Sequence, residues 1–169
     1  MNITEDYLSR AELWMIITIV TYFLINGAQI FETAVFVPKW TANPPGTFSL
    51  LANKNGTSLK TFWIVFRSLH ELTFILAIAF CWKLLPIRNG LLFLFTIHFA
   101  VRVWTLSYFA PNIIDFQKIA EELNSATDVV KRANVWKTLN YVRVGIFIAV
   151  SFGLIPLLLK LLQLKSSNI

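Results

Sequence analysis

Four long apolar segments make up most of this chain, and every one of them contains charged or strongly polar side chains. The segments cover residues 13–37, 61–85, 91–110 and 136–162. At a rise of about 1.5 Å per residue, each segment is long enough to cross the roughly 30 Å hydrocarbon layer of a membrane. Inserting an ionisable group there costs roughly 2.5–3.5 kcal/mol, so these polar residues indicate a functional site.

Composition and charge narrow the class of protein. Hydrophobic residues make up 56% of the 169 residues, which is too apolar for an ordinary soluble domain. The formal charge of +6 comes from scattered basic residues that form no soluble basic stripe, so nucleic acid is not an expected partner. The single cysteine, Cys81, excludes an intrachain disulfide and a multi-cysteine metal site. We predict one all-α domain over residues 1–169, an integral multi-pass membrane protein built as a four-helix bundle.

Prolines and polar stretches mark the expected connections between helices. Pro38, Pro86 and Pro111 are expected to end the first three helices, with a tight turn over residues 86–90. Residues 112–135 are polar with interspersed apolar positions, which predicts a helical extension or a surface helix between the third and fourth spans. An aromatic belt at the span ends would explain Trp14, Trp40, Trp63, Trp82 and Trp136.

The polar residues within the spans recur at helical spacing. Steps of three or four residues place side chains on one stripe of a helix. The four stripes consist of Asn26, Gln29 and Glu32; Arg67, His70 and Glu71; His98 and Arg102; Asn140 and Arg143. All lie towards the span ends that face the two long connections. We therefore expect a polar half-pocket at the end of the bundle that faces the two long connections, and an apolar interior at the opposite end.

The balance of charges within this set predicts an anionic ligand. Three arginines stand against two glutamates, and arginine stays protonated at physiological pH. One guanidinium is therefore expected to lack a protein partner and to bind a small hydrophobic ligand that is, or becomes, an anion.

Two histidines beside arginines suit proton abstraction next to a carbonyl or phenol. A neighbouring cation keeps an imidazole neutral, and a neutral imidazole is a competent base. His98, one turn from Arg102, is the first choice of base and His70 the second. Glu32 would orient one of these groups or carry the proton, and Trp104 would line a planar ligand. We expect an enzyme that removes a proton from its substrate.

Two alternatives remain open. His70 and His98 are the only histidines and could hold haem b or a metal ion between adjacent spans. Counted from the helix ends, however, their depths differ by roughly 6–8 Å, which argues against a shared ligand. A non-catalytic ligand-binding or assembly protein is the other alternative, and self-association is left open.

The basic residues favour one orientation. Four spans place both termini and the 86–90 turn on the same side of the membrane. The turn and the C-terminal tail carry basic residues without acidic ones, which favours cytoplasmic termini.

Two segments resemble a known membrane protein family. Residues 103–114, Val-Trp-Thr-Leu-Ser-Tyr-Phe-Ala-Pro-Asn-Ile-Ile, and 136–143, Trp-Lys-Thr-Leu-Asn-Tyr-Val-Arg, resemble the small four-helix proteins that include anthrone oxygenases. The resemblance implies an oxygenase that oxidises an activated aromatic with dioxygen and without metal or flavin. It carries over Trp136, Asn140 and Arg143 as matching positions.

Overall fold

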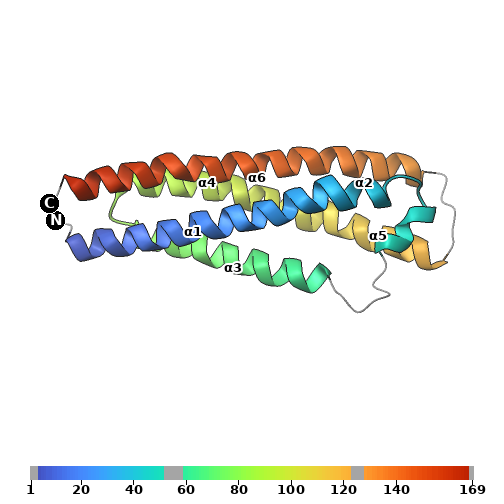
Figure 1. Cartoon of the computed structure of the whole chain (residues 1–169), viewed down its shortest axis with the longest axis horizontal. Helices are drawn as coiled ribbons and strands as arrows, with labels where there is room; N and C mark the ends of the chain where they lie inside the picture. The colour runs from blue at the N-terminus through green and yellow to red at the C-terminus, as the bar shows by residue number, and fades with distance from the viewer. Residues whose placement is uncertain (1–3, 52–58, 123–127, 168–169) are drawn as a thin grey trace. The chain divides into compact units, whose positions relative to one another are not determined.

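The computed structural model describes residues 4–51, 59–122 and 128–167, which are almost entirely helical (Figure 1). In chain order the elements are α1 (Glu5–Phe31), the π-helical turn η1 (Glu32–Phe36), α2 (Val37–Trp40), the 3-10 helix η2 (Gly46–Leu51), α3 (Leu59–Phe80), α4 (Leu85–Trp104), the π-helical turn η3 (Thr105–Phe109), α5 (Ala110–Glu122) and α6 (Val129–Ser166). No strand occurs in these ranges, which confirms the all-α prediction.

Four helical runs are long and apolar enough to span a membrane. They are Glu5–Trp40, Thr61–Phe80, Leu85–Glu121 and Val129–Ser166. Three of them contain 36, 37 and 38 residues, or about 54–57 Å at 1.5 Å per residue, so they are much longer than a roughly 30 Å hydrocarbon layer. The 20-residue run in α3 matches that thickness. The prediction of a multi-pass membrane protein is compatible with this architecture.

The chain forms two compact units. The first contains Met1–Asn26, Lys60–Phe99 and Phe147–Ile169, and the second contains Gly27–Leu59 and Ala100–Ile146. Each is described by itself below.

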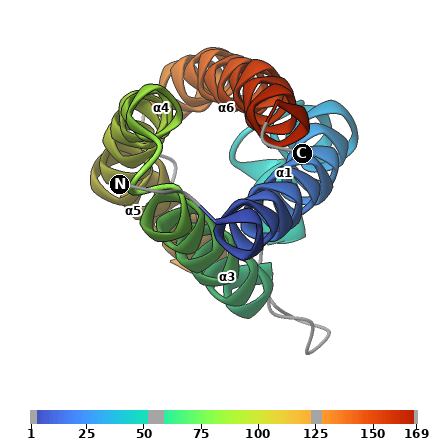
Figure 2. The same cartoon turned by 90° about the vertical axis from the view of Figure 1, so that its left-hand side faces the viewer.

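The first unit is a bundle in which α1, α3, α4 and α6 follow one another around a common axis (Figure 2). The Thr18 hydroxyl of α1 donates a hydrogen bond to the Thr73 carbonyl of α3 over 2.8 Å. α6 approaches α4 at Gly153, where a Cβ would lie 2.9 Å from a Leu94 methyl. Apolar side chains fill the interior, among them Met15, Phe74, Leu84, Leu91, Leu154 and Leu161.

The second unit is organised around an aromatic core that consists of Trp40, Phe48, Phe109, Phe116 and Trp136. Its ring centroids lie 5.0 Å apart for Trp40 and Trp136 and 4.7 Å apart for Phe48 and Phe116. Trp40 and Trp136 are only 1% and 5% exposed, so their assignment to an interfacial belt is wrong. Aromatic rings from α2, η2, η3, α5 and α6 pack on one another instead.

Pro38 and Pro111 do not end their helices. The two π-helical turns end at Phe36 and Phe109, and in each case a proline follows two residues later. A proline ring clashes with the carbonyl four residues earlier, and the wider turn displaces backbone groups just before the ring. The helix therefore continues through both prolines. The extension predicted after the third span exists as α5, while its position at a membrane surface stays a prediction.

The connection between α3 and α4 also differs from the prediction. α3 ends at Phe80 and α4 begins at Leu85, so Pro86 lies in the first turn of α4 and not at the end of α3. Proline is favoured there because its missing N–H would have no helical partner. The predicted turn over residues 86–90 is thus helical, and the true turn covers residues 81–84. The last helix begins at Val129, seven residues before the predicted start.

Candidate functional site

α1 presents a polar stripe to the interior of the first unit. Thr18, Tyr22 and Asn26 recur every four residues, and they are 0%, 1% and 5% exposed. Asn26 donates from Nδ2 to the hydroxyl of Ser151 on α6 over 3.0 Å. The stripe therefore joins α1 to both of its neighbours in the bundle and places the Tyr22 ring at its centre.

Tyr22, His70 and His98 form a compact group that we call the histidine cluster. The Tyr22 hydroxyl lies 3.0 Å from Nδ1 of His98. The Tyr22 and His70 ring centroids are 4.1 Å apart with perpendicular planes, and those of His70 and His98 are 4.9 Å apart. Both histidines are less than 5% exposed. Helices α1, α3 and α4 thus bring three ionisable rings into mutual contact inside the bundle.

Phenylalanines enclose the histidine cluster. The His98 ring lies 5.5 Å from Phe147 and 6.0 Å from Phe95 and from Phe74, measured between ring centroids. Such surroundings exclude water and lower the local dielectric, which strengthens every polar interaction among the three rings.

Arg67 lies one helical turn before His70 on α3 and is 9% exposed. Its guanidinium carbon is 4.8 Å from the Trp63 ring centroid and 5.9 Å from that of Phe147. Phe147 also contacts His98, so one aromatic ring lies close to both the buried cation and the histidine cluster. A negative charge that develops at the cluster would be stabilised by this guanidinium.

The predicted difference in depth between the histidines is wrong, because their rings are in contact. Contact is nevertheless too close for a haem held between them. With metal–nitrogen bonds of about 2.0 Å on both faces, the ring centroids would be roughly 6 Å apart. The observed distance is 4.9 Å, so a haem between the two histidines would require their rings to move apart. The described residues also contain no group of three or more His, Cys, Asp or Glu side chains placed to hold a metal ion.

The second unit contains a separate series of polar contacts around Asn140. Its Nδ2 donates to the Thr33 hydroxyl over 3.0 Å, and its carbonyl oxygen accepts from Nη2 of Arg143 over 2.5 Å. The Arg143 guanidinium also lies 4.2 Å from the Phe109 ring centroid. Thr33 and Phe109 belong to the two π-helical turns, so this chain of contacts connects η1, α6 and η3.

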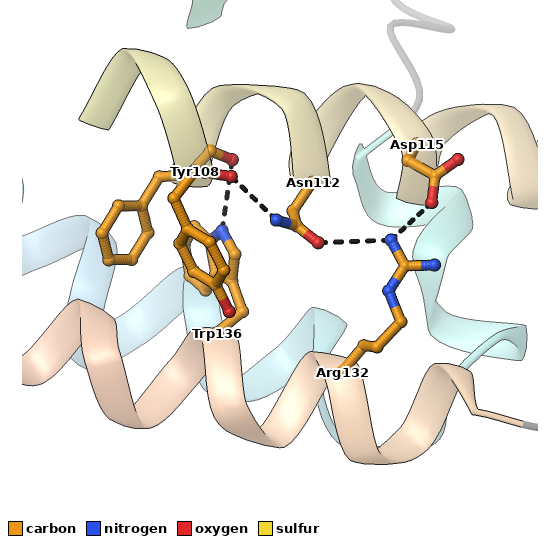
Figure 3. Close-up of polar contacts among 6 residues, drawn as sticks. Tyr108, Asn112, Asp115, Arg132 and Trp136 are labelled. Atoms are coloured by element: carbon orange, nitrogen blue, oxygen red, sulfur yellow. Dashed lines mark hydrogen bonds and ion pairs between the residues drawn. The ribbon is translucent and has the colours of Figure 1, made fainter. Parts of the chain in front are cut away.

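A further network of hydrogen bonds supplies side-chain donors to backbone carbonyls of the π-helical turn η3 (Figure 3). Asn112 Nδ2 donates to the Tyr108 carbonyl over 2.8 Å, and Trp136 Nε1 donates to the Phe109 carbonyl over 3.3 Å. Arg132 donates to both Asn112 and Asp115. These contacts hold α5 against α6.

The predicted site residues divide between the two units. The first unit contains Asn26, Arg67, His70, Glu71 and His98, and the second contains Gln29, Glu32, Arg102, Trp104, Asn140 and Arg143. Glu32, Glu71, Arg102 and Trp104 are half-buried, whereas Gln29 is 1% exposed. The prediction that one guanidinium lacks a protein partner is wrong, because Arg67, Arg102 and Arg143 all interact with other residues.

Sequence reasoning missed Tyr22. The available signal was its position four residues before Asn26, on the same stripe as a residue that was selected. A tyrosine in the middle of a span needs a partner for its hydroxyl, and that requirement alone points to a polar neighbour.

Comparisons with known proteins give no relative from which to transfer a function. No family model matches the chain, and neither the curated proteins nor the solved structures include a significant match.

Proposed function

We propose that this chain is a membrane-embedded oxidoreductase that removes a proton from a small planar, anion-forming substrate and lets the resulting anion react with dioxygen. The observation that carries the proposal is the contact between Tyr22, His70 and His98, all almost fully buried among apolar rings. Buried groups that can accept and donate protons are costly in a membrane interior and are characteristic of sites that handle protons.

The hydrogen bond to Tyr22 gives the two histidines different roles. His98 Nδ1 is the sole acceptor that the described residues offer the Tyr22 hydroxyl. When the hydroxyl donates to Nδ1, a neutral His98 carries its proton on Nε2 and is itself a donor. His70 Nε2 is buried and has no hydrogen-bond partner in the described part of the chain. We therefore assign His70 as the base and His98 as a donor to the substrate oxygen, which reverses the order predicted from sequence.

Arg67 supplies the positive charge for the substrate anion. Its guanidinium and the His98 ring both lie close to the Phe147 ring. In an environment of low dielectric, a fixed cation and an N–H donor stabilise an enolate or phenolate much more than they would in water. Deprotonation at neutral pH becomes feasible for a substrate whose anion is already delocalised.

The chemistry balances for an anthrone-type ketone. His70 removes one proton from the methylene carbon, and the carbanion forms a bond to dioxygen. The resulting peroxide takes a proton back and loses water, which leaves a second carbonyl at the same carbon. One CH2 group and one dioxygen thus yield one C=O group and one water. The family resemblance of residues 103–114 and 136–143 supports this choice of substrate class.

The test uses the full chain in lipid nanodiscs with anthrone. We expect quinone formation and dioxygen uptake in equal amounts, and slower turnover when the methylene carbon carries deuterium. His70→Ala should lower kcat by about 100-fold or more, the usual contribution of a general base. Phe99→Ala alters an exposed side chain next to His98 and serves as the control, with turnover unchanged.

Two results would overturn the proposal. One is the absence of turnover with anthrone and with a panel of phenols and cyclic ketones by folded protein. The other is undiminished turnover in His70→Ala and His98→Ala. A ligand-binding protein would bind the substrate anion without dioxygen uptake, and a Soret band in purified protein would favour the haem alternative.

A further inference from the structure

The start of α1, the α3–α4 turn and the end of α6 lie at the same end of the first unit (Figures 1 and 2). The Lys83 N–H in the turn donates to the Tyr7 hydroxyl of α1 over 3.0 Å. Lys165 near the end of α6 pairs with Glu12 of α1 over 2.7 Å. Residues far apart in the sequence therefore share this end.

The α3–α4 turn and the start of α4 carry basic residues and no acidic ones. Residues 81–90 contain Lys83 and Arg88 and no Asp or Glu. Two of the three acidic side chains in the first part of α1 are paired, Asp6 with Arg10 over 2.8 Å and Glu12 with Lys165. Lys83 is exposed, with its ammonium 5.3 Å from the Tyr7 ring centroid.

Beside these cations lies an exposed aromatic and aliphatic surface. Trp82 is 54% exposed and Leu85 is 58% exposed. The Arg88 guanidinium lies 4.9 Å over the Trp82 ring and donates to the Asn89 side chain over 3.3 Å, which leaves further N–H donors for another acceptor. A tryptophan next to basic residues at a helix end is typical of the membrane–water interface.

We infer that Trp82, Lys83 and Arg88 form a binding surface for the phosphate groups of anionic phospholipids. The tryptophan and leucine would enter the headgroup and upper acyl region, while the ammonium and guanidinium contact phosphate oxygens. Anionic lipids are concentrated in the cytoplasmic leaflet, so this surface places the start of α1 and the end of α6 on the cytoplasmic side. The inference does not depend on the proposed enzymatic function.

Lipid binding is measured by native mass spectrometry of the full chain, titrated with phosphatidylglycerol or with phosphatidylcholine of the same acyl chains. We expect a preference for phosphatidylglycerol that falls about fivefold for each charge removed, in Lys83→Gln and in Arg88→Gln. Arg88→Lys keeps the charge and should retain most of the preference. Lys118→Gln combined with Lys131→Gln removes two exposed cations of the second unit and should leave the preference unchanged.

Two further experiments distinguish binding of a membrane lipid from binding of a soluble phosphate, and test which side of the membrane the C-terminus occupies. Glycerol phosphate at millimolar concentration should not displace the lipid, and displacement would overturn the inference. So would equal binding of both lipids, or an unchanged preference in the Lys83→Gln, Arg88→Gln double variant with intact helical content. A C-terminal reporter that is active only in the cytoplasm should be active, and its inactivity would overturn the orientation.

Discussion

The proposed function of the histidine cluster depends at the residue scale on the hydroxyl of Tyr22. When this hydroxyl donates to Nδ1 of His98, the neutral imidazole carries its proton on Nε2, while packing against the two histidines holds the phenol ring. Removing the hydroxyl keeps the aromatic contacts of the ring and removes the hydrogen bond to His98. Tyr22→Phe therefore tests a positioning role with little change in volume.

We expect Tyr22→Phe to lower kcat by about 10- to 100-fold, because an imidazole free to change tautomer no longer presents a fixed donor. The loss of stability should stay near 1 kcal/mol, the usual net value of a buried hydrogen bond. Steady-state kinetics and thermal unfolding of the same preparation measure both. If kcat is unchanged while stability falls, the hydroxyl is structural only.

Cys81 gives a prediction about reactivity. The residue lies just after α3, is fully buried, and burial raises the pKa of its thiol to about 12. Because the raised pKa keeps the thiol protonated at all pH values below about 12, and the thiolate is the nucleophile, alkylation at pH 8 should be very slow in folded protein. Mass spectrometry after iodoacetamide treatment measures it, with unfolded protein as the control. Rapid labelling of the folded chain would contradict the buried position.

At the scale of helices, the sequence predicted which segments are helical much better than where they end. Hydropathy located all four spans because a span must be continuously apolar. Proline normally ends a helix, and the π-helical turns that let the chain continue through Pro38 and Pro111 leave no compositional signal. The carbonyls that such a turn releases need donors, and those come from distant residues such as Trp136, which sequence spacing cannot reveal.

Trp136→Phe tests whether this side-chain donor matters for η3. The substitution keeps an aromatic ring in the core and removes the N–H that bonds the Phe109 carbonyl. We expect a loss of about 1–3 kcal/mol, the cost of a buried acceptor without its partner. Trp82→Phe alters an exposed ring and should change stability by less than about 0.5 kcal/mol. Equal effects of the two substitutions in chemical unfolding would contradict the role assigned to Trp136.

At the scale of the whole chain, the sequence predicted one domain with one polar site, whereas its polar residues belong to two compact units. Helical spacing and depth could identify polar stripes, because each depends only on position along one helix. Neither could show that Asn140 bonds Thr33 or that His70 meets His98, because those pairings depend on how different helices pack. Position along one helix therefore cannot predict which residues of different helices pair with each other.

The division into units can be tested through Phe48, which is fully buried in the aromatic core of the second unit. Phe48→Ala should cost about 3–5 kcal/mol within that unit, because a large ring is removed from a packed core. If the units open separately, hydrogen exchange will accelerate in α2, η2 and α5, and amides of α3 and α4 around the histidine cluster will keep their protection. Phe99→Ala, at an exposed position of the first unit, should accelerate neither set. Faster exchange across α3 and α4 in Phe48→Ala would instead show one cooperative fold, in which damage to the aromatic core also reaches the histidine cluster.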